Sequence, residues 1–311
     1  MSKNIHFIFN PSELGAGTRG ASLGPEAIRA AARTKGSTLF SEHPIQVVDQ
    51  HNELLDRTSP FPFAKNIDGL SQVFASLEKN ITSCLKADSF PLLISGDHSA
   101  AAGTLASLKQ QFPTQRIGVV WIDAHADIHS PYTTPSGNIH GMPIAAALGL
   151  DHLHLAKNEL DAATIARWNS LKSNAFLAQD LVYIGVRDTE PQEDAIMAEL
   201  GLKNYTVAEL RSTGLNACVA AISAQLQNCD RIYISFDIDS IDPIETSYGT
   251  GTPVPNGITI SEARQLITYF AQDPKTIAIE IVEVNPCLDD HKNKMAETAL
   301  DLIENIIKHL S

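Results

Sequence analysis

Short apolar runs alternate with longer amphipathic stretches along most of the chain. Runs rich in Val and Ile predict strands at residues 5–9, 45–49, 91–95, 117–123, 181–186, 231–239 and 276–284. Helical spacing of apolar residues predicts helices at 24–33, 102–112, 193–200 and 304–310. Near-continuous apolar strands that alternate with helices are typical of a parallel sheet covered on both faces. We see no internal repeat, low-complexity tract or linker, so we expect one α/β domain over residues 1–311.

Three of the predicted strands run directly into acidic and imidazole side chains. The strand from residue 91 is followed by His98, the strand from 117 by Asp123, His125 and Asp127, and the strand from 231 by Asp237 and Asp239. Open parallel sheets bind their ligands outside the carboxyl ends of the strands. These three segments are therefore expected to converge on one site, although they lie far apart in sequence.

The spacing of these residues indicates a metal site. Side chains two residues apart in an extended segment share one face, as Asp123, His125 and Asp127 would, and as Asp237 and Asp239 would. Four carboxylates packed together repel one another strongly, and two divalent ions would cancel their charge. Oxygen-rich ligation with some imidazole and no thiolate favours Mn²⁺, although Co²⁺, Ni²⁺ or Fe²⁺ would fit the same ligands.

A binuclear site predicts hydrolysis. Two ions roughly 3.5–4 Å apart can share a water molecule, lower its pKa and present hydroxide to a trigonal carbon at neutral pH. The competing interpretation is that one Asp-x-His-x-Asp motif only closes a strand and its turn. Three such motifs, each at the end of a strand, make that interpretation much the weaker one.

The composition limits which binding partners and which cellular compartment we expect for this protein. The chain has 23 Lys and Arg against 36 Asp and Glu, a formal charge of −13 with no basic cluster, so nucleic acid is an improbable partner. No apolar run approaches the roughly 20 residues of a membrane span, and we do not expect the first residues to act as a signal peptide. The four scattered cysteines suggest neither disulfides nor a thiolate zinc site and are expected to be reduced packing residues. We expect a cytoplasmic protein.

The three metal motifs resemble those of the ureohydrolase (arginase and agmatinase) family. They read "SGDHS" at 95–99, "DAHAD" at 123–127 and "SFDIDSIDP" at 235–243, and the resemblance runs from "GTRGASLGPEAIR" near residue 18 to "EIVEVNP" at 280–286. The resemblance implies a single three-layer α/β domain with a mostly parallel eight-stranded sheet flanked by helices. Ser95 stands where a Gly is commoner, and we expect it to alter packing more than ligation.

The resemblance also implies which residues hold each ion. One Mn²⁺ would be held by His98, Asp123, Asp127 and Asp237, and the other by His125, Asp123, Asp237 and Asp239. Asp123 and Asp237 would then bridge the two ions. Asp242 falls off the alternating face and is interpreted as a turn residue that supports its loop.

Within the family, the loop "SPYTTPSGNIHGMP" at 130–143 is similar to that of arginases. By this resemblance Ser136 and Asn138 would bind the substrate α-carboxylate, and His140 would transfer protons to the departing amine. Glu283 would bind the guanidinium, with Thr252 near it in a loop that is one residue longer than usual. Taken without the resemblance, 136–138 is an ordinary polar turn and Glu283 a strand-end acid.

Two residues depart from the arginase pattern at the amino-acid end of the substrate. His129 stands where an Asn usually holds the α-carboxylate, and Glu190 stands where an Asp takes the α-amino group. Arginine binding is expected to persist in altered form, and His129 could instead be a loop His with no ligand. His152 and His154 are assigned to a helix or loop surface.

The resemblance predicts a binuclear-manganese arginase that cleaves the guanidinium of L-arginine to urea and L-ornithine. Asp127, His140 and Glu283 would be its catalytic residues. The alternatives are a ureohydrolase for guanidinobutyrate, agmatine or formiminoglutamate and, with less support, a non-catalytic metal-binding relative; a single-metal deacetylase of related fold is weaker still. The family implies a homo-oligomer, a trimer or hexamer, with a small guanidino compound as its partner and no membrane or nucleic acid.

Overall fold

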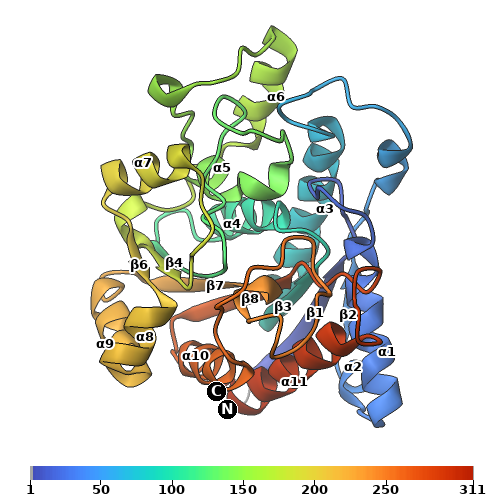
Figure 1. Ribbon diagram of the computed structural model, residues 1–311. Coiled ribbons are helices and arrows are strands. Elements are labelled where there is room, and N and C mark those ends of the chain that lie inside the picture. The colour runs from blue at the N-terminus through green and yellow to red at the C-terminus, as the bar shows by residue number, and fades with distance from the viewer. Residues whose placement is uncertain (1–2, 311) are drawn as a thin grey trace.

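The computed structural model describes residues 3–310, which form a single α/β domain with helices on both faces of one central sheet (Figure 1). The sheet has eight strands in the order β2-β1-β3-β8-β7-β4-β5-β6, and every pairing between these strands is parallel. The strands are β1 (Asn4–Asn10), β2 (Ile45–Val47), β3 (Ser89–Ser95), β4 (Ile117–Ile122), β5 (Leu181–Ile184), β6 (Lys203–Tyr205), β7 (Arg231–Asp237) and β8 (Thr276–Val282). The expected α/β class and eight-stranded sheet are confirmed.

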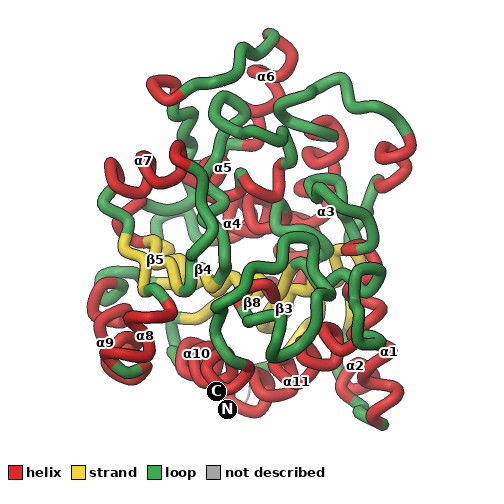
Figure 2. The backbone as a smooth tube through the Cα atoms, in the orientation of Figure 1, coloured by secondary structure: helices red, strands yellow, loops and turns green. Residues whose placement is uncertain are grey.

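The helices divide into two layers. One face of the sheet is covered by α1 (Gly24–Lys35), α2 (Leu39–Glu42), α8 (Val207–Thr213), α9 (Leu215–Gln225), α10 (Ile260–Ala271) and α11 (Lys294–His309). The other face is covered by α3 (Ile67–Lys86), α4 (Ala100–Gln111), α5 (Pro143–Leu148), α6 (Ala162–Leu171) and α7 (Pro191–Leu200). Figure 2 shows the strands as a thin layer between these helices. Each layer has its own apolar core, because the central strands present buried side chains on both faces.

The apolar pattern located most strands but not all of their ends. All seven predicted strands are present, and β6, which has the sequence Lys-Asn-Tyr, lacks the apolar run that would have predicted it. The strand predicted over 231–239 ends at Asp237, and residues Ile238–Ser240 form a 3₁₀ turn. The strand predicted over 276–284 likewise ends at Val282. Both strands therefore stop just where the candidate site residues begin.

Several side chains lie elsewhere than their sequence context predicted. His152 is buried, at 9 % exposure, and not on the surface. Of the cysteines, Cys84, Cys218 and Cys229 are buried as expected, whereas Cys287 is exposed; none of the four forms a disulfide. Among the described residues no helix has the length and apolar character that a membrane span requires.

Candidate active site

The loops that follow β3, β4, β7 and β8 meet above the centre of the sheet. These four strands are neighbours, in the order β3-β8-β7-β4, and all point the same way, so their carboxyl ends lie side by side. The convergence expected from the three motifs is therefore present, and the loop after β8 adds Glu283 to it. This is the edge at which open parallel sheets bind ligands.

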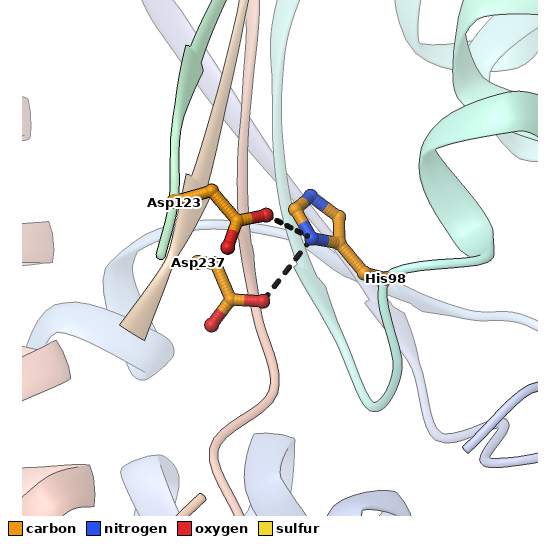
Figure 3. Close-up of side chains that lie close together, drawn as sticks. All are labelled: His98, Asp123 and Asp237. Carbon is orange, nitrogen blue, oxygen red and sulfur yellow. Dashed lines mark ion pairs between the residues drawn. The ribbon is translucent and has the colours of Figure 1, made fainter. Parts of the chain in front are cut away.

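A first cluster gathers around His98. Its Nδ1 lies 3.1 Å from a carboxylate oxygen of each of Asp123, Asp127 and Asp237. Figure 3 shows Asp123 and Asp237 pointing at this nitrogen from the ends of two neighbouring strands. His98 and the three acids are all buried.

A second cluster gathers around His125. Its Nδ1 lies 3.1 Å from Oδ2 of Asp239 and 3.4 Å from Oδ1 of Asp123. Asp123 thus reaches His98 with one oxygen and His125 with the other. The two groups, His98-Asp123-Asp237 and Asp123-His125-Asp239, each have the ligand atoms and proximity that a metal ion requires.

The acids converge for a different reason from the one that the sequence suggested. β4 ends at Ile122, so residues 123–127 do not continue as a strand with alternating faces. Asp127 instead has left-handed backbone, with φ of 51°, which non-glycine residues rarely adopt. The loop turns its carboxylate to His98, while His125 faces the second cluster.

The charges in the two clusters fit divalent cations. Burial and the neighbouring carboxylates Asp239 and Asp123 raise the pKa of Asp237 well above its usual value. Burial lowers the pKa of His98, but hydrogen bonds to the surrounding acids more than offset it and raise that pKa well above the ordinary value. A buried group of four acids thus needs positive charge, from protons on its imidazoles or from ions that replace them.

The spacing fits as well. Neighbouring ligands of a six-coordinate ion with bonds of about 2.1 Å lie about 3 Å apart. The distances of 3.1 Å between His98 Nδ1 and its three acids match that separation. His98 is also held in place, since its ring stacks on Trp121 at 4.0 Å and its Nε2 lies 2.8 Å from Ser235 Oγ. The residues are therefore suited to hold two divalent ions.

Glu283 and His140 lie together beside these clusters. His140 Nδ1 is 3.2 Å from Glu283 Oε1, and the same carboxylate oxygen accepts a hydrogen bond from the His98 backbone N–H. Burial lowers the pKa of His140, but the hydrogen bond and charge of Glu283 outweigh it and raise that pKa to about 9. His140 therefore holds a proton at neutral pH. Glu283, like Asp127, has left-handed backbone, with φ of 67°.

A cavity of about 270 Å³ opens onto the clusters. Among its lining residues are His98, His125, Asp127 and Asp237 from the clusters and the predicted substrate residues His129, Ser136, Asn138, His140, Glu190 and Thr252. Thr252 also donates a hydrogen bond to Asp239, at 3.0 Å. The cavity therefore brings together acids, imidazoles and polar loop residues from segments across the chain.

Three residues that line this cavity, His129, Glu190 and Glu193, contact one another. His129 Nε2 lies 2.8 Å from Glu190 and 3.8 Å from the buried Glu193, and its Nδ1 contacts Thr133. The His129 hydrogen bond lowers the pKa of Glu190, whereas burial raises the pKa of Glu193. His129 and Glu190 are thus partners of each other, which their positions in the sequence did not reveal.

Other residues at the cavity were missed because their roles depend on tertiary contacts. Lys65 donates to Asn138 Oδ1 at 3.0 Å, and Asp188 lies 3.7 Å from His125. Arg187 fastens two site loops by donating to the backbone carbonyls of Asp239 and Val254. The expected supporting role of Asp242 agrees with the structure, since its carboxylate accepts from the N–H groups of residues 244 and 257.

Comparisons with known proteins agree with this geometry. The model of the Arginase family matches residues 3–308. An arginase from Bacillus subtilis is 33% identical over 317 residues, covering 99% of this chain and 98% of its own. The solved structure of Entamoeba histolytica arginase in complex with L-ornithine superposes with a TM-score of 0.84 at 26% identity, covering 98% of this chain and 99% of its own. Formimidoylglutamase from Bacillus subtilis shares the fold, with a TM-score of 0.76 at 22% identity over 99% of this chain and 87% of its own.

Proposed function

The chain belongs to the arginase family of ureohydrolases, and on that premise we propose that it hydrolyses L-arginine to urea and L-ornithine with two Mn²⁺ ions. The observation that carries the proposal is that both His-Asp clusters and the 136–140 loop face one cavity, with Glu283 paired to His140 beside it. A guanidinium reaching the clusters would pass polar loop residues suited to the other end of an amino acid.

The metal ligands in this proposal are the six residues of the two clusters. His98 and Asp127 would hold one ion and His125 and Asp239 the other, and Asp123 and, by the family resemblance, Asp237 would serve both. Two divalent cations at such a site supply an activated water molecule and polarise the substrate. The resident ion is Mn²⁺, with Co²⁺, Ni²⁺ or Fe²⁺ as substitutes.

The chain's own side chains bind the substrate and move protons. The Glu283 carboxylate pairs with the planar guanidinium and holds its carbon beside the clusters. Asp127 accepts the proton of the attacking water. His140, which holds a proton at neutral pH, donates to the departing nitrogen and returns protons from solvent.

The remaining lining residues recognise the amino-acid end. Ser136 and Asn138 contact the α-carboxylate, and Lys65, which donates to Asn138, adds positive charge there. Glu190 takes the α-amino group, and its longer side chain is steadied by His129. Thr252 lies at the guanidinium end beside Asp239.

One observation favours a second candidate substrate. Glu190 is already paired with His129 at 2.8 Å, so an α-ammonium group must compete with an imidazole for the carboxylate. A guanidino acid without an α-amino group, such as 4-guanidinobutyrate, would leave that pair intact. Agmatine and formiminoglutamate are further candidates of the same reaction class.

The deciding experiment is urea release by Mn²⁺-loaded protein from L-arginine, agmatine and 4-guanidinobutyrate under identical conditions. The proposal expects the highest kcat/KM for L-arginine. A preference for 4-guanidinobutyrate would refute the arginine assignment and retain the hydrolysis, and the variant His129→Asn would then be expected to shift preference back. Formamide release from formiminoglutamate is measured alongside, because cleavage of the corresponding C–N bond in that substrate yields formamide and glutamate and no urea.

We further propose that residues 1–311 form one domain and that the chain assembles as a trimer or hexamer. Size-exclusion chromatography with light scattering measures the assembly directly. A monomer at micromolar concentration would refute that expectation.

A further inference from the structure

A buried carboxylate lies beneath the metal clusters and has no part in the proposed mechanism. Glu280 sits in the middle of β8 and is fully buried. Both of its oxygens accept hydrogen bonds, Oε1 from the Ser95 hydroxyl and Oε2 from the Tyr233 hydroxyl at 2.6 Å. A buried acid is costly unless such donors satisfy it, so its presence calls for a physical explanation.

The register of the sheet explains how these side chains meet. β8 lies between β3 and β7, with Glu280 paired to Leu93 on one side and to Ser235 on the other. Ser95 is two residues beyond Leu93, and Tyr233 is two residues before Ser235, so all four polar side chains face the same layer. The group is therefore built by three adjacent strands (Figure 1).

The group continues upward to His98. The Ser235 hydroxyl lies 2.8 Å from His98 Nε2, and Ser235 is two residues beyond Tyr233 on the same face of β7 and paired with Glu280 on β8. Burial and the nearby Glu280 raise the pKa of Tyr233 well above its ordinary value, so this phenol keeps its proton and donates. The hydroxyls of Tyr233 and Ser235 thus lie between Glu280 and the imidazole, one bonded to each end.

The path has a preferred direction because both oxygens of Glu280 accept hydrogen bonds from hydroxyl groups. Tyr233 gives its proton to Glu280, which leaves the phenol oxygen to accept from Ser235. Ser235 then has no proton for His98 and accepts from Nε2–H. An imidazole with its proton on Nε2 keeps the lone pair of Nδ1, the atom that faces Asp123, Asp127 and Asp237.

We propose that Glu280 is a positioning residue that acts through Tyr233 and Ser235 to hold His98 in the tautomer and orientation that bind the metal ion. This inference rests on the proposed ligand role of His98. Outer hydrogen-bond partners of metal-bound imidazoles act in this way in general, and their loss weakens metal binding about 10–100-fold. Ser95, expected to matter for packing alone, then also supports ligation through its hydrogen bond to Glu280.

Three variants test the path. Tyr233→Phe removes the central hydroxyl without changing the ring, and Glu280→Met removes the accepting end at similar size. Glu280→Gln is the matched control, because its amide oxygen can still accept from Tyr233 while its nitrogen donates to Ser95. If Glu280→Met fails to fold, Tyr233→Phe alone still tests the path.

The main measurement is Mn²⁺ binding to metal-free protein, followed by the electron paramagnetic resonance signal of free Mn²⁺. We expect two binding steps in the wild type, one of them abolished in His98→Asn, which identifies the step that depends on His98. That step should weaken about tenfold or more in Tyr233→Phe and Glu280→Met and stay near wild type in Glu280→Gln. General loosening of the core would not be confined to one step, nor would it be rescued by Gln.

A second readout is independent of affinity and activity. In protein loaded with diamagnetic Zn²⁺ and labelled with ¹⁵N-His, the Nε2–H signal of His98 should be present in the wild type and Glu280→Gln and weakened in Tyr233→Phe. Folded Tyr233→Phe and Glu280→Met proteins with wild-type Mn²⁺ affinity and an unchanged His98 signal would overturn the inference alone. A wild-type protein that binds no Mn²⁺ would overturn the proposed function and this inference together.

Discussion

Gly137 holds the proposed substrate loop against a neighbouring loop in a way that only glycine permits. Its φ is +75°, in the left-handed region, and its N–H donates to Thr134 Oγ1 at 3.0 Å. Its carbonyl accepts from the backbone N–H of Lys65 at 2.9 Å. A Cβ at this position would overlap the Pro62 carbonyl oxygen and lie 2.9 Å from the carbonyl carbon, both of them backbone atoms that cannot rotate away.

Gly137→Ala should therefore destabilise the protein by about 2–5 kcal/mol. Left-handed backbone costs a non-glycine residue about 1–2 kcal/mol. Relieving the overlap separates the two loops and breaks the hydrogen bond from the Lys65 N–H to the Gly137 carbonyl. Leaving these two groups without partners adds about 1–3 kcal/mol to the loss of stability. At roughly 2 °C per kcal/mol for a chain of this size, the melting temperature should fall by about 4–10 °C.

Two other glycines separate the backbone contribution to this stability loss from the contribution of the contact with Pro62. Gly201 also has positive φ, +62°, but nothing lies within 4 Å of the point that a Cβ would occupy, so Gly201→Ala should cost the backbone part alone. Gly141, next to His140, has neither the positive φ nor the neighbour, and Gly141→Ala should be near neutral. Urea unfolding of the three variants gives the comparison. Equal destabilisation by Gly137→Ala and Gly201→Ala would refute the contact argument.

The same variant should affect the substrate. Displacing residues 134–138 moves Ser136 and Asn138, so kcat/KM for L-arginine should fall by at least about tenfold, mainly through KM. Gly201→Ala is the control for activity, because Gly201 does not line the cavity. A Gly137→Ala protein with unchanged KM would remove Ser136 and Asn138 from substrate recognition.

Three further predictions concern the metal clusters, proton transfer and pH. Mn²⁺ at about 100 times its Kd should stabilise the wild type by about 2.7 kcal/mol per site in thermal unfolding, and Asp237→Asn should lose most of this gain; equal gains in both would exclude Asp237 as a ligand. Asp127→Asn and His140→Ala should lower kcat about 100-fold or more while changing KM little, and near-wild-type kcat in both would contradict their roles. Burial lowers the pKa of His152 to about 4, so the stability it contributes is full above about pH 6.5 and is lost as the pH falls toward 4. Urea unfolding of His152→Asn should show a weaker pH dependence across that window, and an identical pH dependence would count against it.

The sequence predicted the parts of this molecule that depend on local pattern. Apolar runs located seven of the eight strands, because each of the seven carries two or more Val, Ile, Leu or Phe residues. The positions of His98, Asp123 and Asp237 at strand ends then placed them at one edge of a parallel sheet. β6 was missed because three residues at the border of a sheet need no apolar pattern.

The parts that could not be predicted depend on contacts between distant segments. The alternation of side chains along a strand predicted that Asp127 shares a face with Asp123 and His125. In the structure Asp127 reaches His98 through left-handed backbone, which the residue type does not predict. His129 and Glu190 are separated by 61 positions, and their hydrogen bond exists only because the loops after β4 and β5 meet. The Ser95-Glu280-Tyr233 group likewise requires the register of three strands.

Left-handed backbone at both Asp127 and Glu283 shows how the fold sets the geometry of the site. Each residue accepts a conformation that costs of order 1–3 kcal/mol and persists only where surrounding structure enforces it. For Asp127 that enforcement includes the hydrogen bond from the N–H of Ile144 at the start of α5, and for Glu283 the bond from its own N–H to the carbonyl of Gly96. The loop after β8 is thereby tied to the loop after β3, so Glu283, the acid proposed to bind the guanidinium, and His98 move together. In the proposed reaction, the position of the substrate relative to the two His-Asp clusters would therefore be governed by the backbone of adjacent strands. Preference among substrates would then depend on the loops that carry Ser136 and the His129–Glu190 pair.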